Sequence, residues 1–365
     1  MRIGVARETT PGERRVALVP ESAARLVKAG VEVVVERDAG RAAFFTDDAY
    51  ERAGATMADT AAVLGADVVL KVQRPTPAEV ARMKDGAILI SLLPVHTSAD
   101  VMSVLAERGV SALALERVPR ITRAQSMDIL SSQATVAGYK AVLIAASHMG
   151  KLLPMLTTAA GSIPPAKAFV VGAGVAGLMA IATARRLGAV VSGFDIRAAA
   201  REQVLSLGAT FVGPEPQADA EAAGGYARAQ TEDEQQRTLA ALASHVKDQD
   251  LVITTAQIPG RPAPRLITAE MIATMRPGAV IVDLAAESGG NCEVTRAGEI
   301  VDRNGVSIIG AVNVPSSVPY HASLMFSKNV LTLLQHLIKD GNIVLNLEDE
   351  ITGPMCVVHA GAVKA

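Results

Sequence analysis

A glycine pattern near the middle of the chain limits its fold more than any other feature. The spacing G-x-G-x-x-G occupies Gly172–Gly177 and directly follows an apolar run that ends at Val171. A helical pattern at Leu178–Leu187 comes next, and a second apolar run covers Val190–Phe194. A strand, a glycine turn, a helix and a second strand in this order predict a parallel βαβ unit with a right-handed crossover.

Each glycine of this pattern has its own purpose in a turn that binds a dinucleotide. Gly172 allows a tight turn, Gly174 lets the backbone approach a pyrophosphate, and Gly177 lets the helix pack closely on the sheet. The helix N-terminus attracts the pyrophosphate anion. Asp195 ends the next strand, where a carboxylate bonds a ribose 2′-hydroxyl and repels a 2′-phosphate, which favours NAD(H) over NADP(H). Arg197 could instead accommodate that phosphate, and a purely structural glycine turn is the alternative reading.

Apolar runs and helical patterns alternate along the whole chain, which predicts an α/β fold with mostly parallel sheets. Apolar residues make up 50% of the chain and aromatic residues only 3%, so the cores must consist mainly of Ala, Val, Leu and Ile. Ahead of the glycine unit we expect strands at Arg2–Ala6, Val31–Glu36, Asp67–Val72, Ala87–Leu92 and Ser111–Leu115, with helices at Pro20–Ala29, Thr76–Met83 and Ala99–Arg108. After the glycine unit we expect helices at Arg197–Leu207, Gln235–Val246 and Ala269–Met275, and strands at Thr210–Val212, Asp250–Thr255, Val280–Asp283 and Val306–Ile309.

The length of 365 residues is too great for one typical domain, so two domains are expected. A helical run at Thr135–Gly150 would leave the first domain and enter the second. The helix pattern Leu324–Ile338 and the strand pattern Asn342–Leu347 near the C-terminus could pack back on the first sheet.

Charge and cysteine content exclude several classes of function. The formal net charge is −2, so nothing suggests a surface for nucleic acid. Neither the two cysteines, Cys292 and Cys356, nor the six histidines show metal-ligand spacing, so no metal site is expected. The uncharged run Ser307–Ser327 contains prolines and polar residues and is a poor membrane span. With no signal-peptide pattern at the N-terminus, a soluble chain in a reducing cytoplasm is expected.

Further candidate cofactor contacts follow strands of the second domain, because the carboxyl ends of parallel strands face the ligand crevice. They are Thr255, Ala256, Gln257, Leu284 and Asn313. Ordinary loop capping is the alternative for all of them.

The polar segment Arg120–Ala134 lies between apolar stretches ahead of the glycine pattern. An ion pair of Arg120 with Asp128 could fix a loop, leaving amide and hydroxyl groups to hold a carboxamide. The alternative is a helix N-terminus with Ser126 or Asp128 as the cap. The spacing alone favours neither reading.

Two cations and one histidine of the first domain also qualify as site residues. Arg15, in a charged loop, and Lys71, at a strand end, could together bind a small carboxylate, or both could be solvated charges. His96 follows a strand and is the one histidine considered for catalysis, although a surface histidine is the simpler reading.

Several motifs in this order resemble one family. The run PRITRAQSMDILSSQATVAGYKAV, followed by GAGVAG, Asp195, GGYA, TTAQIPG, IVDLAAESGGNCE and NVPS, is similar to the NAD(H)-binding component of proton-translocating nicotinamide nucleotide transhydrogenase. The resemblance covers essentially the whole chain. It implies two Rossmann-like, doubly wound parallel-sheet domains, one of residues 1–132 with 319–365, completed by the C-terminal segment, and an NAD(H)-binding one of residues 133–318.

The resemblance also implies roles for individual residues. Arg120, Gln125, Asp128 and Ser131 match the family loop that holds the nicotinamide end, and Tyr226 matches the tyrosine of a mobile loop that closes over the nucleotide. On the motif and the resemblance together, the expected cofactor-binding residues are Gly172, Ala173, Gly174, Val175, Ala176, Gly177, Asp195, Ile196, Arg197, Gly225, Tyr226, Thr255, Ala256, Gln257, Leu284 and Asn313.

In this family, hydride passes directly from NADH to NADP⁺, and NADP(H) is held on a separate beta subunit. A second, membrane-spanning alpha polypeptide couples the transfer to proton movement. The resemblance thus implies a homodimer at the cytoplasmic face of the inner membrane, attached through its partners. Direct transfer between two nicotinamide rings needs proximity and orientation rather than an acid or base.

Two other functions remain open on the sequence. An enzyme resembling alanine dehydrogenase shares the two-domain plan, and Arg15, Lys71 and His96 suit its substrate site in character. The RAQSMDILSSQ segment is foreign to that family. A subunit that only senses NAD(H) or binds partners is the second alternative.

Overall fold

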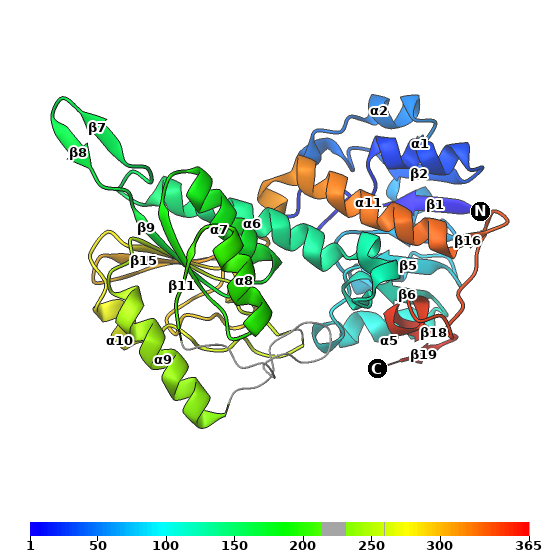
Figure 1. Cartoon of the computed structure of the whole chain (residues 1–365). Coiled ribbons are helices and arrows are strands. Elements are labelled where there is room, and N and C mark those ends of the chain that lie inside the picture. Colours follow the sequence, from blue (N-terminus) through cyan, green and yellow to red (C-terminus); the bar gives the residue numbers. More distant parts are fainter. Residues whose placement is uncertain (214–230, 259, 365) are drawn as a thin grey trace. The chain divides into compact units, whose positions relative to one another are not determined.

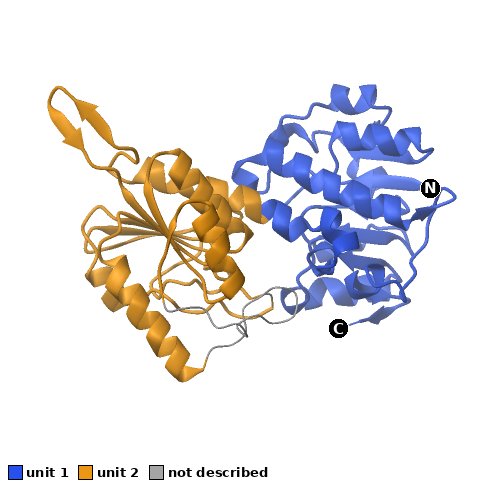
Figure 2. Ribbon diagram, in the orientation of Figure 1, with its two compact units in different colours: residues 1–133, 315–365 blue, residues 134–314 orange. Residues whose placement is uncertain are grey.

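The computed structural model describes the chain except for residues 214–230, 259 and 365. It divides into two compact units, residues 1–133 with 315–365 and residues 134–314 (Figure 2). Each unit is built around one twisted sheet with helices on both faces, so the expected α/β fold with two doubly wound sheets is confirmed. Figure 1 shows the order of the elements along the chain.

Unit 1 contains an eight-stranded sheet in the order β19-β18-β6-β5-β4-β1-β2-β3. The strands β1 to β6 are all parallel, whereas β18 pairs antiparallel with β6 and β19 antiparallel with β18. The strands are β1 Arg2–Val5, β2 Glu32–Glu36, β3 Thr56–Ala58, β4 Val68–Leu70, β5 Ile88–Ser91, β6 Ser111–Ala114, β18 Cys356–His359 and β19 Ala362–Val363. The helices are α1 Pro20–Lys28, α2 Asp47–Arg52, α3 Thr60–Leu64, α4 Pro77–Val80, α5 Ala99–Glu107, α11 Pro319–Leu337 and α12 Thr352–Met355.

Unit 2 contains a seven-stranded sheet in the order β11-β10-β9-β12-β13-β15-β14, parallel except for the edge strand β14. Its strands are β9 Lys167–Val171, β10 Val190–Phe194, β11 Thr210–Phe211, β12 Leu251–Thr254, β13 Val280–Asp283, β14 Ile300–Arg303 and β15 Val306–Gly310. Its helices are α7 Val175–Arg186, α8 Ala198–Ser206, α9 Glu232–Val246 and α10 Ala269–Ala273. Counted along the chain, the parallel strands of each unit follow the doubly wound order 3-2-1-4-5-6.

Burial on both faces explains why the strands are continuously apolar. In β2, Val33 and Val35 pack into a core with α1 and α11, whereas Val34 packs on the other face with α3 and α5. In β9, Val170 packs toward α7 and Phe169 toward α9. This period of two is the pleat of a strand, and buried parallel strands read as apolar runs for the same reason.

Helix α6, Ile129–His148, begins six residues before the predicted run, directly after Asp128. It is the one helix of the described residues that is long and apolar enough to span a membrane, yet Ala141, Val142 and Ala145 are fully buried in the core of unit 2. The composition of α6 is therefore that of a core helix.

Several other boundaries differ from the predictions. Helix α7 begins at Val175, inside the glycine pattern, and α11 begins at Pro319, where proline suits the first helical turn. The predicted strand Asn342–Leu347 is wrong: only β17, Asn342–Ile343, forms, and it pairs with β16, Ile338–Lys339, in a separate ribbon. The strand that completes the sheet of unit 1 is β18, whose apolar run is too short to stand out in the sequence.

A second two-stranded ribbon lies in unit 2 and was not predicted. It consists of β7, Leu156–Thr158, and β8, Gly161–Ile163, and all six of these residues are exposed. Single-turn 3-10 helices complete the secondary structure at η1 Arg41–Ala43, η2 Val95–Thr97, η3 Leu115–Arg117, η6 Ala286–Ser288 and η7 Val314–Ser317, and a longer one, η4, covers Thr122–Met127.

Candidate functional site

The glycine turn of unit 2 lies at the switch point of its sheet, between the carboxyl ends of β9 and β12. Gly172 has a φ of +98°, and the Thr255 hydroxyl donates to its carbonyl over 2.9 Å. A Cβ on Gly177 would lie 1.8 Å from the Gly172 carbonyl oxygen. These contacts leave no room for side chains at either glycine, as a tight turn closely packed on its helix requires.

Gly174 differs from the other two glycines because open space surrounds it. A Cβ there would meet no atom closer than Arg197 Nη2, at 4.0 Å. Gly174 is also the N-cap of the 12-residue helix α7, and no side chain caps this helix. The backbone and the dipole of α7 are therefore available to a phosphate anion, so the residues present fit the pyrophosphate of a dinucleotide.

Asp195 follows β10 and is 8% exposed. Its Oδ2 accepts from the Ala173 amide over 2.7 Å and from Arg197 Nη2 over 2.8 Å. Its Oδ1 accepts from the amide and Nε of Arg197, both over 2.9 Å. Four donors fill the acceptor capacity of a carboxylate, so a ribose hydroxyl could reach Asp195 only by replacing one of them. The neighbouring Ile196 packs partly buried against the core.

The expected contacts after β12 and β13 form one connected loop system. Gln257 Nε2 donates to the Leu284 carbonyl over 2.8 Å. The buried Asn291 accepts from the Ala256 amide over 2.9 Å and donates to the carbonyls of Ala256 and Pro264 over 2.8 Å. Asn291 was not predicted as a site residue, although its amide fixes the loop that carries three of them.

The remaining predicted cofactor residues of unit 2 are less well connected to this system. Asn313 follows β15 with a φ of +42°, and its amide donates to Glu287 over 3.2 Å. Val175 opens α7 and is 42% exposed, and Ala176 follows it. Gly225 and Tyr226 lie outside the residues that the structure describes.

The polar segment of unit 1 forms the 3-10 helix η4 and the start of α6. The Asp128 carboxylate accepts from the Ser131 amide over 2.9 Å and from the Ser131 hydroxyl over 2.6 Å, as an N-cap does. The reading of a helix start capped by Asp128 is therefore confirmed. Arg120 and Gln125 are exposed, while Asp128 and Ser131 are half-buried. A cap function leaves the other groups of the segment open to a ligand.

Arg15 and Lys71 are neither an open carboxylate site nor solvated charges. Arg15 is 3% exposed and pairs with Glu13 over 2.7 Å. Lys71 is 1% exposed, with Glu79 at 2.8 Å and Glu8 at 3.9 Å. Because internal carboxylates already neutralise both cations, the expectation that they bind a small carboxylate is wrong for this structure.

The pKa values of these glutamates differ because their partners differ. Burial would raise the pKa of Glu13, but hydrogen bonds and the charge of Arg15, with help from Gln73, lower it from 4.5 to about 2. Burial raises the pKa of Glu8 from 4.5 to about 7, since Lys71 is distant and only the amides of Val72 and Gln73 oppose the effect.

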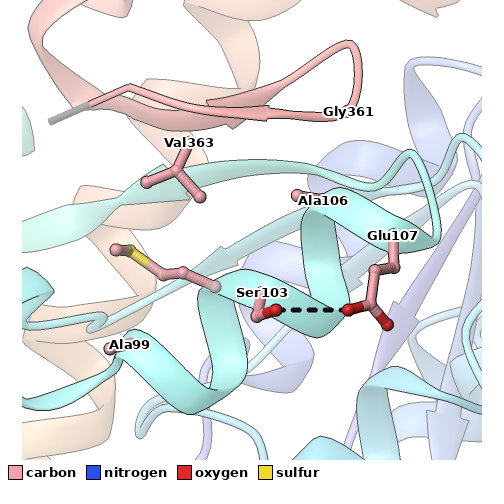
Figure 3. A pocket seen from close by; sticks show the side chains of 7 residues that line it. Ala99, Ser103, Ala106, Glu107, Gly361 and Val363 are labelled. Atoms are coloured by element: carbon pink, nitrogen blue, oxygen red, sulfur yellow. Dashed lines mark hydrogen bonds between the residues drawn. The ribbon is translucent and has the colours of Figure 1, made fainter.

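Other candidate features do not form a site. His96, in η2, is exposed, which favours the reading of a surface histidine. A cavity of about 400 Å³ lies between α5 and β19, where Ser103 donates to Glu107 over 3.2 Å (Figure 3). No predicted site residue lines it. Among the described residues, no cluster of three or more His, Cys, Asp or Glu could hold a metal ion.

Comparisons with known proteins match the whole chain. Family models for the alanine dehydrogenase/PNT N-terminal domain and C-terminal domain match residues 4–137 and 141–365. The first portion of NAD(P) transhydrogenase subunit alpha from Rhodospirillum rubrum is 50% identical, over 100% of this chain and 97% of its own. The crystal structure of transhydrogenase from Sinorhizobium meliloti superimposes with a TM-score of 0.92 and 46% identity over 100% of both chains. Alanine dehydrogenase 2 of Staphylococcus aureus is more distant, at 32% identity over 91% of this chain and 86% of its own.

Proposed function

The chain belongs to the alanine dehydrogenase/PNT family, and on that premise we propose that it is the NAD(H)-binding subunit of a proton-translocating nicotinamide nucleotide transhydrogenase. The observation that carries the proposal is the match over the entire chain to a transhydrogenase subunit, at 50% identity. The match to an alanine dehydrogenase reaches only 32%. The identity therefore extends to the polar segment of unit 1 as well as to the dinucleotide fold that both kinds of enzyme share.

Unit 2 would hold the cofactor. The amides at the start of α7, beside Gly174, would bind the pyrophosphate, and Asp195 would bond the adenosine ribose after one Arg197 contact opens. The loops at Thr255–Gln257 and Leu284, fixed by Asn291, would line the nucleotide. Bound NADH supplies the hydride.

Unit 1 would supply the groups that orient the nicotinamide. Arg120, Gln125, Asp128 and Ser131 offer cationic, amide, carboxylate and hydroxyl groups of the kinds that bond a carboxamide. Transfer of hydride to a second nicotinamide requires no proton at a protein atom. The work of these residues is then to hold one ring in the geometry of attack and to exclude water.

The remaining elements of the proposal concern partners. NADP(H) would be held by a beta subunit, and a second, membrane-spanning alpha polypeptide would carry the proton. This chain would then lie at the cytoplasmic face of the inner membrane. The name of the Rhodospirillum rubrum relative, which describes it as one portion of an alpha subunit, supports an assembly of several subunits.

A homodimer is proposed as well, and the β7–β8 ribbon supports it. An isolated two-stranded ribbon is marginal in water, yet this one exposes Leu156 and Ile163 at 39% and 44%, beside Met155 at 64%. A second copy of the chain would cover these side chains. Sedimentation of the wild type and of Leu156→Asp should show a dimer and a shift toward monomer, and an unchanged dimer would place the contact elsewhere.

Reconstitution tests the proposed reaction. The purified chain is mixed with the NADP(H)-binding and membrane components of a transhydrogenase, and hydride transfer from NADH to an absorbance-shifted NADP⁺ analogue is followed. Turnover that needs both the chain and its partners is the expected result. Alanine-dependent reduction of NAD⁺ by the chain alone would support an amino-acid dehydrogenase instead. Binding of NADH without either activity would support a sensing subunit.

A further inference from the structure

The C-terminal helix α11 contacts the polar segment of unit 1 at a residue far from it in sequence. Asn329 Nδ2 donates to the Ser126 carbonyl in η4 over 2.8 Å, and Asn329 is only 9% exposed. Around this bond, Ala124 and Met127 of η4 are buried in the same core as Phe326 and Val330 of α11. The exposed side of η4 carries Gln125, with Arg120 exposed just before it, so its buried side is the one that α11 holds.

A second amide holds the other end of the segment. Gln133, in the second turn of α6, is 7% exposed. Its Nε2 donates to the Ala322 carbonyl of α11 over 3.1 Å and to the Ser132 hydroxyl over 3.3 Å, while its Oε1 accepts from Arg15 Nη1 over 2.9 Å. Because one neighbour donates and the other accepts, the amide of Gln133 has a single orientation that satisfies both.

The buried ion pair of Arg15 with Glu13 thereby acquires a purpose. Glu13 fixes the guanidinium, the guanidinium fixes Gln133, and Gln133 joins the start of α6 to α11. The loop that carries Arg15 is attached to the same helix, since the amides of Val16 and Val19 donate to Ser323 and Ser327 of α11 over 3.1 and 3.0 Å.

We propose that Asn329 and Gln133 are positioning residues that fix the backbone of the Arg120–Ser131 segment for hydride transfer. This inference rests on the proposed function. A role in folding alone does not account for Asn329, because its Oδ1 is buried without a hydrogen-bond partner among the described residues, which costs free energy that a leucine would not. The retained amide has one use in the structure, the bond to Ser126.

Turnover in the reconstituted complex is the first readout, with Asn329→Leu and Gln133→Leu. The expected result is a fall in kcat of about tenfold to a hundredfold, since a small misplacement of an orienting group is costly. The Kd of NADH, set mainly in unit 2, should change by less than about threefold. Asn329→Asp and Gln133→Glu keep the size and remove the donors, and they replace the leucine variants if those fail to fold. Gln335→Ala, on the exposed side of α11, is the matched control and should behave as wild type.

Hydrogen–deuterium exchange of the full chain is a second readout that needs no activity. Peptides that cover residues 122–133 should exchange faster in both variants, while the glycine turn at 172–177 should not change. Unchanged exchange, or a kcat equal to wild type, would overturn the inference. If the wild type itself transfers no hydride with any partner, the proposed function fails, and faster exchange still shows whether these amides hold the segment.

Discussion

Gly138 of helix α6 and Ala176 of the glycine turn are in such close contact that no side chain fits between them. A Cβ on Gly138 would lie 2.0 Å from the Ala176 carbonyl oxygen and 3.0 Å from its Cα. Ala176 belongs to the first turn of α7, beside the expected pyrophosphate position. Gly138 therefore sets how closely α6 packs against the dinucleotide turn, although nothing in its sequence context marks it as a site residue.

Replacing Gly138 by alanine should weaken both the fold and NADH binding. The methyl group must displace the backbone at Ala176, at a cost of about 1–3 kcal/mol, despite the better helix propensity of alanine. We expect a lower Tm and an NADH Kd raised by about tenfold, measured by calorimetry. Gly150→Ala is the control, because a Cβ there would meet open space. Unchanged binding by Gly138→Ala would mean that the turn is not the pyrophosphate site.

Removing Arg197 should release the Asp195 carboxylate. Three of its four hydrogen bonds come from Arg197, two of them from the guanidinium. If nucleotide must displace those contacts, Arg197→Ala should raise the affinity for NADH, whereas Asp195→Ala should lower it and relax discrimination against NADPH. Competition binding with the two nucleotides measures both effects. An unaltered preference in Asp195→Ala would remove the assignment of the ribose partner.

Asp128→Asn separates the cap from the proposed function of the segment. Asparagine is as good an N-cap as aspartate, so the free energy of unfolding should change little. Hydride transfer should nevertheless slow strongly, with the NADH Kd within about tenfold of wild type, about 1.4 kcal/mol. Arg120→Ala should act in the same direction. Stopped-flow transfer rates and denaturant titration of each variant test this, and a large loss of affinity with normal transfer contradicts the positioning role.

Glu8 should make stability depend on pH between about 4.5 and 7. Its pKa in the folded chain, about 7, lies above its usual 4.5, so the folded state binds the extra proton. The free energy of unfolding should therefore fall as pH rises through this range and then level off. Glu8→Gln should lack that slope and gain stability at pH 8. Urea denaturation from pH 5 to 8 measures it, with the exposed Glu51→Gln as control. A wild-type curve without the slope would show that Glu8 remains ionised.

The glycine turn shows how far local sequence reaches. Gly172–Gly177 with β9, α7 and β10 appears where the pattern put it, because a tight turn between a strand and a helix depends on neighbours in the chain. The strand β18 was missed for the opposite reason. Its four residues gain their stability from pairing with β6, more than two hundred positions earlier, and no local period announces that pairing.

The fold class, the dinucleotide turn and the family could be read from the order of residues alone, since each depends on residue types at short spacings. The surroundings of each charge became visible only in the folded chain. There Arg15 and Lys71 are neutralised from within, and Asp195 is already filled by Arg197. There too α11, from the end of the chain, holds the polar segment through Asn329 and Gln133. Burial and hydrogen-bond partners are set by residues distant in sequence, and packing alone brings them together.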